Sequence, residues 1–521
     1  MWRRVFQKHA QRFARETRGA ALLLTTICIT VIFGVTAIAI DYGQALILKG
    51  KLRNAADAAA LVVGSRPNIT QAQADTIAGA YIRANYPDLA LGTMTNFSVQ
   101  MTNTSVDVVV TANLATTFLK ILGTDSMTVS VNSRSSRNQG RLELVLALDN
   151  TGSMCNPDCT ERLDRLKEAA ETLVNILFGD NETSEDVKIA LVPFSATVNL
   201  GNSALGRGWI DETGLSPLNS EDTDLSPTQP SLLQLFDAMV NVPWGGCVRA
   251  RTGGLDVTDT PPDASSGDTL WVPYFAPDEQ GPGDASSYFN DYIPDTGGER
   301  NPDRYIGQSL SPSQINAGRG PNMNCVARPL LPLTNVKSTI TTAIQNMTAD
   351  GSTVIPTGLS WAWRLISPGE PYTEGAPYTE PNVSKAIVLL TDGRNQVERG
   401  GPYFSWYSAY GFARSGHMGA TDGSESRTVL NTKTETICSN IRADKDGDPT
   451  TEDIFVYTIA FRIDSGSETL DNETRAVLQN CATPAEKCPG EQCFYDSPTG
   501  SDLTQIFSKI AIGLNGLRIS K

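Results

Sequence analysis

Carboxylate and hydroxyl side chains directly follow an apolar segment, residues 142–148, of this 521-residue chain. The segment holds a single charge among apolar residues, which predicts a strand that is covered on both faces. Asp149, Thr151 and Ser153 come after it, so one tight turn offers a carboxylate and two hydroxyl groups. Oxygen ligands of this kind are the ones that hard divalent cations prefer.

Two later segments offer further oxygen ligands. Thr353 precedes an expected helix, and Asp392 follows the apolar run 386–390 in the turn sequence Thr-Asp-Gly. Because ligands gather at the carboxyl edge of an open α/β sheet, we expect these segments to meet Asp149 there. Two carboxylates and three hydroxyls predict a divalent-metal site. Mg²⁺ is the ion we expect, and Mn²⁺ or Ca²⁺ would also suit the ligands. Thr357 is the alternative to Thr353 as the middle ligand.

Strand-like and helix-like segments alternate around these residues. Further apolar runs predict buried strands at 187–194 and 454–461, and helical spacing predicts helices at 162–178, 434–441, 468–478 and 503–514. This alternation indicates an α/β domain with a doubly wound, mostly parallel sheet over residues 142–515. Residues 200–333 and 394–430 are rich in Gly, Pro, Asp and Ser, so we expect them to be insertions. Aromatic residues in the first insertion argue against full disorder.

The spacing of the oxygen ligands resembles the metal-ion-dependent adhesion site (MIDAS) of von Willebrand factor A-type (VWA) domains. That site consists of Asp-x-Ser-x-Ser, a distant threonine and a Thr-Asp-Gly turn. Five residues match these positions: Asp149, Thr151, Ser153, Thr353 and Asp392. Thr151 departs from the pattern, since many members have serine there, but it keeps the hydroxyl. The resemblance implies a Rossmann-like VWA fold whose metal takes an acidic side chain of a protein partner as its last ligand.

The N-terminal region has the composition of a membrane anchor. Residues 1–19 carry six bases and one acid, and residues 20–40 are 21 residues without a charge. As a helix this segment would measure about 32 Å, enough to cross a bilayer. The preceding bases predict a cytoplasmic N-terminus and place the rest of the chain outside the inner membrane of a bacterium. A cleaved signal peptide is the alternative, but no small-residue cleavage site follows the segment.

Charge and cysteine content agree with this placement. Subtracting the +5 of residues 1–19 from the total of −15 leaves −20 for the remainder, which argues against nucleic-acid binding. Cys28 lies in the apolar segment, and the other eight cysteines are an even number suited to an oxidising compartment. The connectivity is not fixed by the sequence. We expect neighbours to pair, as Cys155–Cys159, Cys247–Cys325, Cys438–Cys481 and Cys488–Cys493. Zinc is a poor alternative because the chain has two histidines and no Cys-x-x-Cys.

Residues 41–135 are expected to form a small pilin-like α+β region, followed by a polar linker at 136–141. Helices are predicted at 46–63 and 70–84, and β-branched residues predict strands at 97–99, 106–110 and 127–131. The basic segment, the apolar helix, Ile40-Asp41-Tyr42-Gly43 and the alanine-rich stretch 52–61 resemble TadE/TadG-like pilus-assembly segments. Joined to a VWA domain, the whole chain resembles a TadG-like Flp (Tad) pilus assembly protein. The resemblance implies a role in building or anchoring a pilus. Pilin-like relatives can be cut after a glycine such as Gly19, but Leu24 stands here where the peptidase prefers a glutamate.

These features favour a binding protein over an enzyme. Ser153 has no evident general base or nucleophile elbow, and His417 has no evident catalytic partner. The acidic stretch 444–448 departs from an EF-hand loop and reads as a solvated turn. We therefore expect a membrane-anchored extracytoplasmic VWA protein that binds an acidic partner through a metal, in pilus assembly, anchoring or adhesion. The alternative is a structural scaffold of the cell envelope in which the metal only stabilises the fold.

Overall fold

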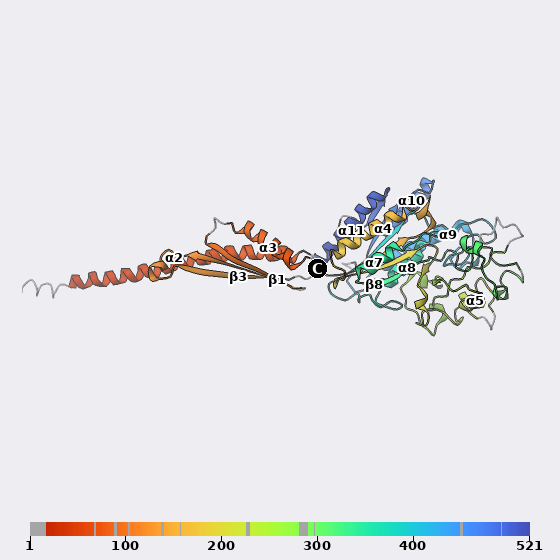
Figure 1. The fold of residues 1–521 in the computed structure, drawn as a ribbon, viewed down its shortest axis with the longest axis horizontal. Helices are drawn as coiled ribbons and strands as arrows, with labels where there is room; N and C mark the ends of the chain where they lie inside the picture. Colours follow the sequence, from red (N-terminus) through yellow and green to blue (C-terminus); the bar gives the residue numbers. More distant parts are fainter. Residues whose placement is uncertain are drawn as a thin grey trace, which may run out of the picture. The chain divides into compact units, whose positions relative to one another are not determined.

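The computed structural model divides the chain into two compact units, Met1–Asn138 and Gln139–Lys521. The ribbon is drawn in Figure 1. The structure describes residues 17–66, 69–87, 91–102, 105–136, 140–156, 158–225, 230–280, 290–295, 297–448, 452–490 and 492–520. Residues 1–16, which hold most of the predicted basic segment, lie outside the described residues.

The N-terminal unit packs two helices on a three-stranded antiparallel sheet. Its elements are α2 (Thr17–Gly64), α3 (Gln71–Asn85), β1 (Thr93–Met101), β2 (Ser105–Ala115), the 3₁₀ helix η1 (Leu119–Leu122) and β3 (Ser126–Ser136), with strand order β1-β2-β3. Small side chains of α2, such as Ala55, Ala56 and Ala59, are fully buried in its core. Asp41 fixes the β2–β3 connection, because its carboxylate accepts hydrogen bonds from the backbone N–H groups of three successive residues, 117–119, at 2.6–3.0 Å.

The first part of α2 differs from the rest of the helix in its surroundings. Within the described residues, Leu24–Gly64 is long and apolar enough to cross a membrane, with a mean hydropathy of 2.0 in its most apolar window. Large apolar side chains such as Phe33 and Val35 are exposed there, whereas Leu48 and Leu52 are buried against the sheet. The helix therefore combines an apolar exposed segment with a packed one, as the sequence predicted.

The C-terminal unit is built on a six-stranded sheet with the order β11-β10-β9-β4-β5-β8. Five strands are parallel, and the edge strand β8 is antiparallel to β5. The strands are β4 (Arg141–Asp149), β5 (Val187–Phe194), β8 (Leu331–Thr334), β9 (Val383–Thr391), β10 (Phe455–Phe461) and β11 (Phe494–Ser497). This topology confirms the predicted α/β class with a mostly parallel, doubly wound sheet.

Helices cover both faces of this sheet (Figure 1). One face carries α8 (Ile355–Ile366), α9 (Gly423–Ile441) and α10 (Glu468–Cys481), and the other carries α4 (Leu163–Phe178), α7 (Lys337–Gln345) and α11 (Gly500–Ser520). The central strand β4 serves both cores, since Val145 and Ala147 face the α8 side and Leu144, Leu146 and Leu148 face the α4 side. This is why the segment 142–148 is apolar on both faces.

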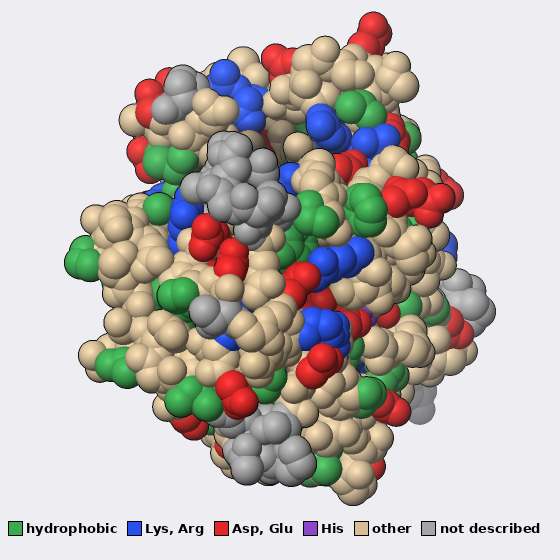
Figure 2. Space-filling view, turned by 90° about the vertical axis from the view of Figure 1, so that its right-hand side faces the viewer, with side chains coloured by type: hydrophobic (Ala, Val, Ile, Leu, Met, Phe, Trp, Pro, Cys, Tyr) green, Lys and Arg blue, Asp and Glu red, His purple; other side chains and the backbone are tan. Residues whose placement is uncertain are grey.

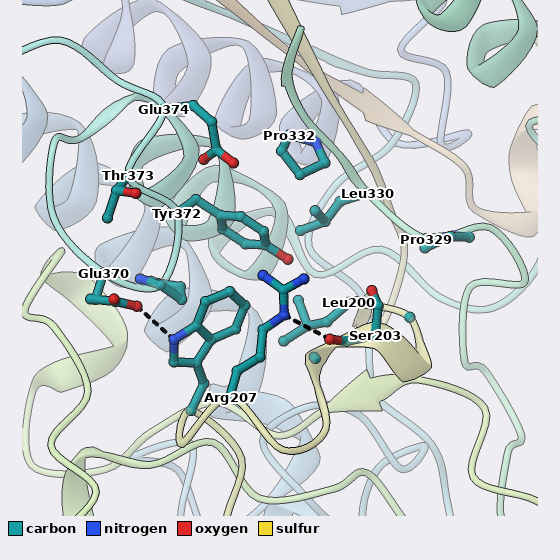
Figure 3. Close-up of a pocket in the computed structure, with 14 residues that line it drawn as sticks. Leu200, Ser203, Arg207, Pro329, Leu330, Pro332, Glu370, Tyr372, Thr373 and Glu374 are labelled. Carbon is teal, nitrogen blue, oxygen red and sulfur yellow. Dashed lines mark hydrogen bonds between the residues drawn. The ribbon is translucent and has the colours of Figure 1, made fainter.

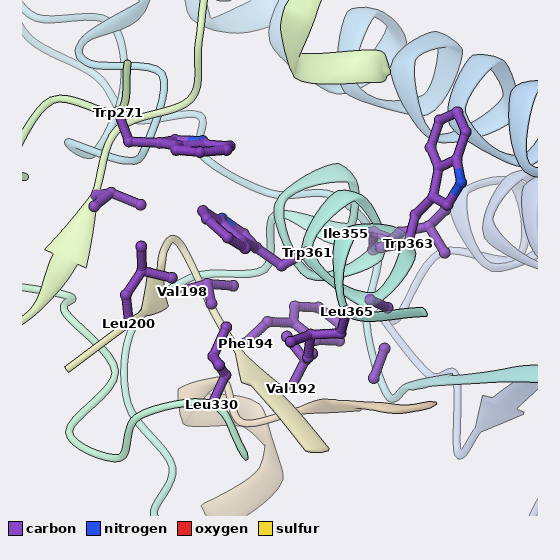
Figure 4. Packing of buried hydrophobic residues seen from close by; sticks show 14 of the residues in the cluster. Val192, Phe194, Val198, Leu200, Trp271, Leu330, Ile355, Trp361, Trp363 and Leu365 are labelled. Atoms are coloured by element: carbon purple, nitrogen blue, oxygen red, sulfur yellow. The ribbon is translucent and has the colours of Figure 1, made fainter. Parts of the chain in front are cut away.

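The first predicted insertion is a packed structure rather than an open loop. Strand β6 (Val198–Asn199) directly precedes it. Its own short elements are η3 (Asn202–Ala204), η4 (Pro217–Ser220), α5 (Leu232–Ala238), β7 (Cys247–Val248), η5 (Leu255–Val257), η6 (Gly267–Thr269), η7 (Pro302–Tyr305) and α6 (Pro312–Asn316). Trp271 lies against Trp361 of α8, with ring centroids 4.8 Å apart (Figure 4). Aromatic burial of this kind supplies a core for a segment that has little regular structure.

Several boundaries differ from the sequence-based expectation. Helix α9 begins at Gly423, inside the predicted insertion 394–430, because Asp422 caps it by accepting hydrogen bonds from the N–H groups of the next turn. Its first turns are polar, so apolar spacing did not reveal them. The linker was expected at 136–141. Strand β3 continues to Ser136, the first residue of that range, and β4 begins at Arg141, the last residue of that range. The edge strand β8 overlaps the end of the predicted insertion 200–333.

All four predicted disulfides are present. Cys155–Cys159 closes the loop between η2 (Gly152–Cys155) and α4, and Cys247–Cys325 joins β7 to the end of the first insertion. Cys438–Cys481 links α9 to α10, and Cys488–Cys493 precedes β11. Cys28 is the free cysteine. The expectation of a disulfide-bonded protein is thus confirmed.

Candidate metal site at the carboxyl edge of the sheet

Asp149 is the last residue of β4, and its side chain is fully buried. Its Oδ1 accepts a hydrogen bond from the backbone N–H of Thr151 at 2.9 Å, and its Oδ2 accepts one from the hydroxyl of Thr391 at 2.5 Å. Thr391 ends the neighbouring strand β9. The two central strands therefore fix the orientation of this carboxylate at the edge where a ligand was expected.

The hydroxyls that follow β4 connect this strand to Asp392. The Thr151 and Ser153 hydroxyl oxygens lie 2.8 Å apart, and the Ser153 hydroxyl donates to Asp392 Oδ1 at 2.6 Å. The structure therefore places both carboxylates and both of these hydroxyls in one hydrogen-bonded group.

The segment that carries Thr353 is joined to the same turn by the backbone. Gly152 donates its N–H to the carbonyl of Gly351 at 2.9 Å. A Cβ on Gly393 would stand 3.3 Å from Thr353 Oγ1 and 4.0 Å from Ser153 Oγ, so these two hydroxyls lie within 7.3 Å of each other (3.3 + 4.0). Thr357, the alternative ligand, lines a different cavity under the first insertion. The structure thus brings the five predicted ligand residues together.

The electrostatics of this cluster suit a cation. Burial, and then the charge of Asp392, raise the pKa of Asp149 to about 7. Burial also raises the pKa of Asp392, while hydrogen bonds from Ser153 and Arg162 act in the opposite direction. When both carboxylates are ionised, their charge exceeds that of Arg162, which pairs with Asp392, and a bound divalent ion would offset the excess. The oxygen donors are of the kind that Mg²⁺, Mn²⁺ and Ca²⁺ accept, so the residues fit such an ion.

Sequence reasoning missed three residues of this cluster. Arg162, the N-cap of α4, pairs its guanidinium with Asp392 Oδ2. Thr391 holds Asp149, and its place beside Asp392 in the Thr-Asp-Gly turn was the available signal. The Ser352 hydroxyl is buried without a hydrogen-bond partner in the described structure, next to Thr353. No local pattern signals that the Arg162 side chain turns back toward the sheet edge.

A groove of about 410 Å³ adjoins the cluster. Thr151, Ser153 and Thr353 contribute to its lining, together with Asn324 from the first insertion and Trp406 from the second. Figure 2 shows the molecule from the end that carries the insertions; on the described part of this face, acidic and basic side chains are interspersed and hydrophobic ones are scattered. Three of the five predicted ligand residues therefore border this groove.

A second cavity, of about 370 Å³, contains none of the predicted ligands (Figure 3). The Trp209 indole donates to Glu370 at 2.6 Å, and the Arg207 guanidinium lies over the same ring and donates from Nε to the Ser203 carbonyl at 2.8 Å. Tyr372 packs beside Trp209, with ring centroids 5.2 Å apart. These contacts hold the insertion to the segment that follows α8.

Two other polar features have local explanations. His417 lies within an ion-pair cluster with Arg249 and Glu221 that joins the two insertions. Asp444, Asp446 and Asp453 place their carboxylate oxygens within 4.8 Å of one another, but the first two are exposed. This agrees with the expected solvated acidic turn, and it provides a comparison site for metal binding.

The sequence of the N-terminal helix matches a known family. Residues 19–66, which cover nearly all of α2, match the family described as Flp pilus-assembly TadE/G-like. The chain carries a TadE/G-like segment. The resemblance expected from the sequence is thereby confirmed for this part of the protein. No curated protein sequence matches the chain.

Solved structures similar to the chain include pilus and VWA proteins. The pilus adhesin SpaC of Lactobacillus rhamnosus GG is 10% identical, with 82% of this chain and 35% of that chain covered and a TM-score of 0.32. The von Willebrand factor domain of the type V pili tip protein Mfa5 of Porphyromonas gingivalis is 10% identical, with 72% and 96% covered and a TM-score of 0.33. Proximal thread matrix protein 1 of the mussel byssus, with a zinc-occupied MIDAS motif, is 13% identical, with 72% and 45% covered and a TM-score of 0.28. The chain with its TadE/G-like segment thus spans less than half of the adhesin and of the byssus protein.

Proposed function

We propose that the C-terminal unit binds a divalent cation and uses it to hold an acidic side chain of a pilus-assembly partner. The ligands would be Asp149, Thr151, Ser153, Thr353 and Asp392. A bound divalent ion supplies positive charge and open coordination positions that a partner's oxygen can fill. The observation that carries the proposal is the convergence of these five side chains from three separate loops, beside an accessible groove.

The remaining residues of the cluster would position the ligands and keep their charges in balance. Thr391 holds Asp149 through Oδ2, and Arg162 holds Asp392 through Oδ2. Neither contact provides an activated nucleophile or a general base, so we propose a binding role without catalysis.

The TadE/G-like helix would anchor the protein in the bacterial inner membrane, with its N-terminus in the cytoplasm and the chain beyond about Asp41 outside. The apolar exposed part of α2 and the bases that precede it support this orientation. A protein tethered in this way can meet pilus components at the envelope and hold them through the metal, in assembly, anchoring or adhesion.

Calorimetric titration of the full chain in detergent with Mg²⁺ and Mn²⁺ tests the site. Wild-type protein should bind one ion per chain, Asp149→Asn should lose that binding, and Asp446→Asn in the exposed acidic turn should keep it. Asn keeps the shape of Asp149 and removes its charge, so the fold should survive. Binding that disappears in Asp446→Asn instead would move the ion to the acidic turn and overturn the proposal.

The scaffold alternative remains because the cluster also ties three loops together through Gly152–Gly351 and Ser153–Asp392. Asp392→Asn separates the two roles. If the metal serves partner binding, the variant loses capture of an acidic peptide in the presence of Mg²⁺ and keeps its unfolding temperature. If the metal only stabilises the fold, the unfolding temperature in Mg²⁺ falls to the value in a chelator.

A further inference from the structure

Two arginines, Arg251 in the first insertion and Arg364 on α8, are buried without an ion-pair partner among the described residues. Arg251 and Arg364 are 1% and 2% exposed. Their guanidinium carbons lie 4.3 and 5.4 Å from the ring centroid of Trp271. The hydrogen bonds of both groups go to neutral backbone carbonyls: Thr269, Leu255 and Thr260 for Arg251, and Leu255 and Thr258 for Arg364. Buried charges are normally paired, so this arrangement calls for an explanation.

The two positive charges are also close together. Both Nη2 atoms donate to the carbonyl oxygen of Leu255, at 3.2 and 2.9 Å, so they lie at most 6.1 Å apart (3.2 + 2.9). Burial, and then the charge of Arg364, lower the pKa of Arg251 to about 8, and burial lowers that of Arg364 to about 10. Both pKa values lie above neutral pH, so at pH 7 the two guanidinium groups remain mostly protonated and repel each other.

The nearest carboxylates are already engaged. Asp256 accepts from Lys433 at 2.6 Å and from the Tyr410 hydroxyl at 3.1 Å. Asp259 accepts from the Ser367 hydroxyl at 2.7 Å. Arg251, Arg364 and Lys433 against Asp256 and Asp259 leave a charge of +1 in this part of the molecule.

A small cavity lies among these groups. It measures about 10 Å³, which is room for one atom of about the size of a water molecule. Its lining includes both arginines, Trp271 and Thr357, and also Arg249, Tyr410 and the acidic Asp256. The carboxylate of Asp256 is held by Lys433 and the Tyr410 hydroxyl. The Nε atoms of Arg251 and Arg364 and the hydroxyl of Thr357 are buried with no hydrogen-bond partner in the described structure. Two of the three groups are donors without acceptor capacity, and the hydroxyl can serve as a third donor.

We propose that this cavity binds a small monovalent anion of the halide class, chloride under ordinary conditions, held by Arg251, Arg364 and Thr357. A halide accepts several hydrogen bonds at once and cancels the excess charge, whereas a water molecule leaves that charge in place. Phosphate and sulfate are too large for the space. The ion lies between the insertion and α8, which begins two residues after Thr353, and so fastens the insertion to that helix independently of any metal.

Thermal unfolding of the full chain in detergent tests this site, in sodium chloride, sodium bromide and sodium gluconate at equal ionic strength. The wild-type midpoint should rise with chloride or bromide concentration and not with gluconate. Thr357→Val should weaken the apparent chloride affinity at least tenfold, and Arg364→Met should abolish the chloride dependence. Ser360→Ala is the matched control, since Ser360 lines the same cavity but donates within α8 to the Thr357 carbonyl at 3.1 Å.

Thr357→Val keeps the test decisive if Arg364→Met fails to fold. A bromide anomalous peak between the two guanidinium groups would place the ion directly. Equal midpoints in chloride and gluconate, or a chloride effect that Thr357→Val leaves unchanged, would overturn the proposal in favour of an ordered water or of general salt stabilisation.

Discussion

Arg162 places a positive charge directly on a proposed metal ligand. Its side chain is 17% exposed, and its guanidinium pairs with the fully buried carboxylate of Asp392. The guanidinium of Arg162 would repel a divalent ion at the site, and because the site is largely buried, water would screen this repulsion only weakly. We therefore predict that Arg162→Gln binds Mn²⁺ at least about tenfold more tightly than wild type, roughly 1.4 kcal/mol, in calorimetric titration.

Arg165→Gln is the control for this measurement. Arg165 lies one turn further along α4 and pairs with Glu168 at 2.7 Å in a solvent-exposed position, so its loss should leave the affinity unchanged. Equal affinities for wild type and Arg162→Gln would show that Arg162 does not compete with the ion. The proposed site itself would stand in that case, since it is tested by Asp149→Asn.

Most of the candidate site could be predicted because strand ends are visible in the sequence. Asp149 and Asp392 end apolar runs that must be central strands, and parallel strands meet at one edge. Arg162 could not be predicted in this way. Its approach to Asp392 depends on how the chain returns into α4 after the Cys155–Cys159 loop, which no local pattern fixes. The ion pair belongs to the tertiary structure.

The two insertions are joined by the ion-pair cluster of Glu221, Arg249 and His417. Burial would raise the pKa of Glu221, but Arg249 and His417 outweigh it and lower the pKa to about 2, against 4.5 for the free group. Because the folded-state pKa is depressed, the ionised carboxylate stabilises the protein above pH 4.5. That contribution is lost as the pH falls from 4.5 to about 2.

We therefore predict that Glu221→Gln lowers the free energy of unfolding at pH 7 by up to about 3 kcal/mol. The deficit should shrink as the pH falls below 4.5, which urea denaturation at several pH values would measure. Asp224→Asn is the control, because its carboxylate pairs with Arg300 in an exposed position. A deficit for Glu221→Gln that is the same at pH 7 and pH 3 would contradict the assignment.

The helices α9 and α10 are joined covalently by Cys438–Cys481, across a sequence separation of 43 residues. In the chain-entropy model a loop of this length is worth about 4 kcal/mol, and the short Cys488–Cys493 loop about 2 kcal/mol. The double variant Cys438→Ala/Cys481→Ala should thus lose roughly twice as much stability as Cys488→Ala/Cys493→Ala in denaturant titrations. The reverse order would mean that burial, rather than loop length, sets the contribution of each bridge.

The elements themselves were predictable where apolar residues show a clear period, and not at the edges. Strand β4 and helix α4 follow directly from their apolar patterns, whereas β8 and β11 are four residues each and contain turn-forming residues such as Pro332 and Asp496. Such short strands owe their conformation to the neighbours β5 and β10. The fold of the first insertion was equally hidden, because isolated aromatics such as Trp271 acquire partners only in the tertiary structure.

At the scale of the whole molecule, eight cysteines stand on one side of the apolar part of α2 and all are in disulfides. Disulfides persist in the periplasm and are reduced in the cytoplasm, so the orientation of the protein sets the oxidation state of its cysteines.

Labelling of free thiols tests this orientation. Cells are quenched with acid, and their protein is denatured without reductant and treated with a maleimide polymer. The full chain should then take up one label, on Cys28. After reduction it should take up nine. Cys28→Ser should take up none before reduction, which assigns the single label. Eight or nine labels on the wild-type chain without reduction would mean that its cysteines are thiols, as expected in the cytoplasm. That result would exclude the proposed orientation, which the positive-inside bias predicts.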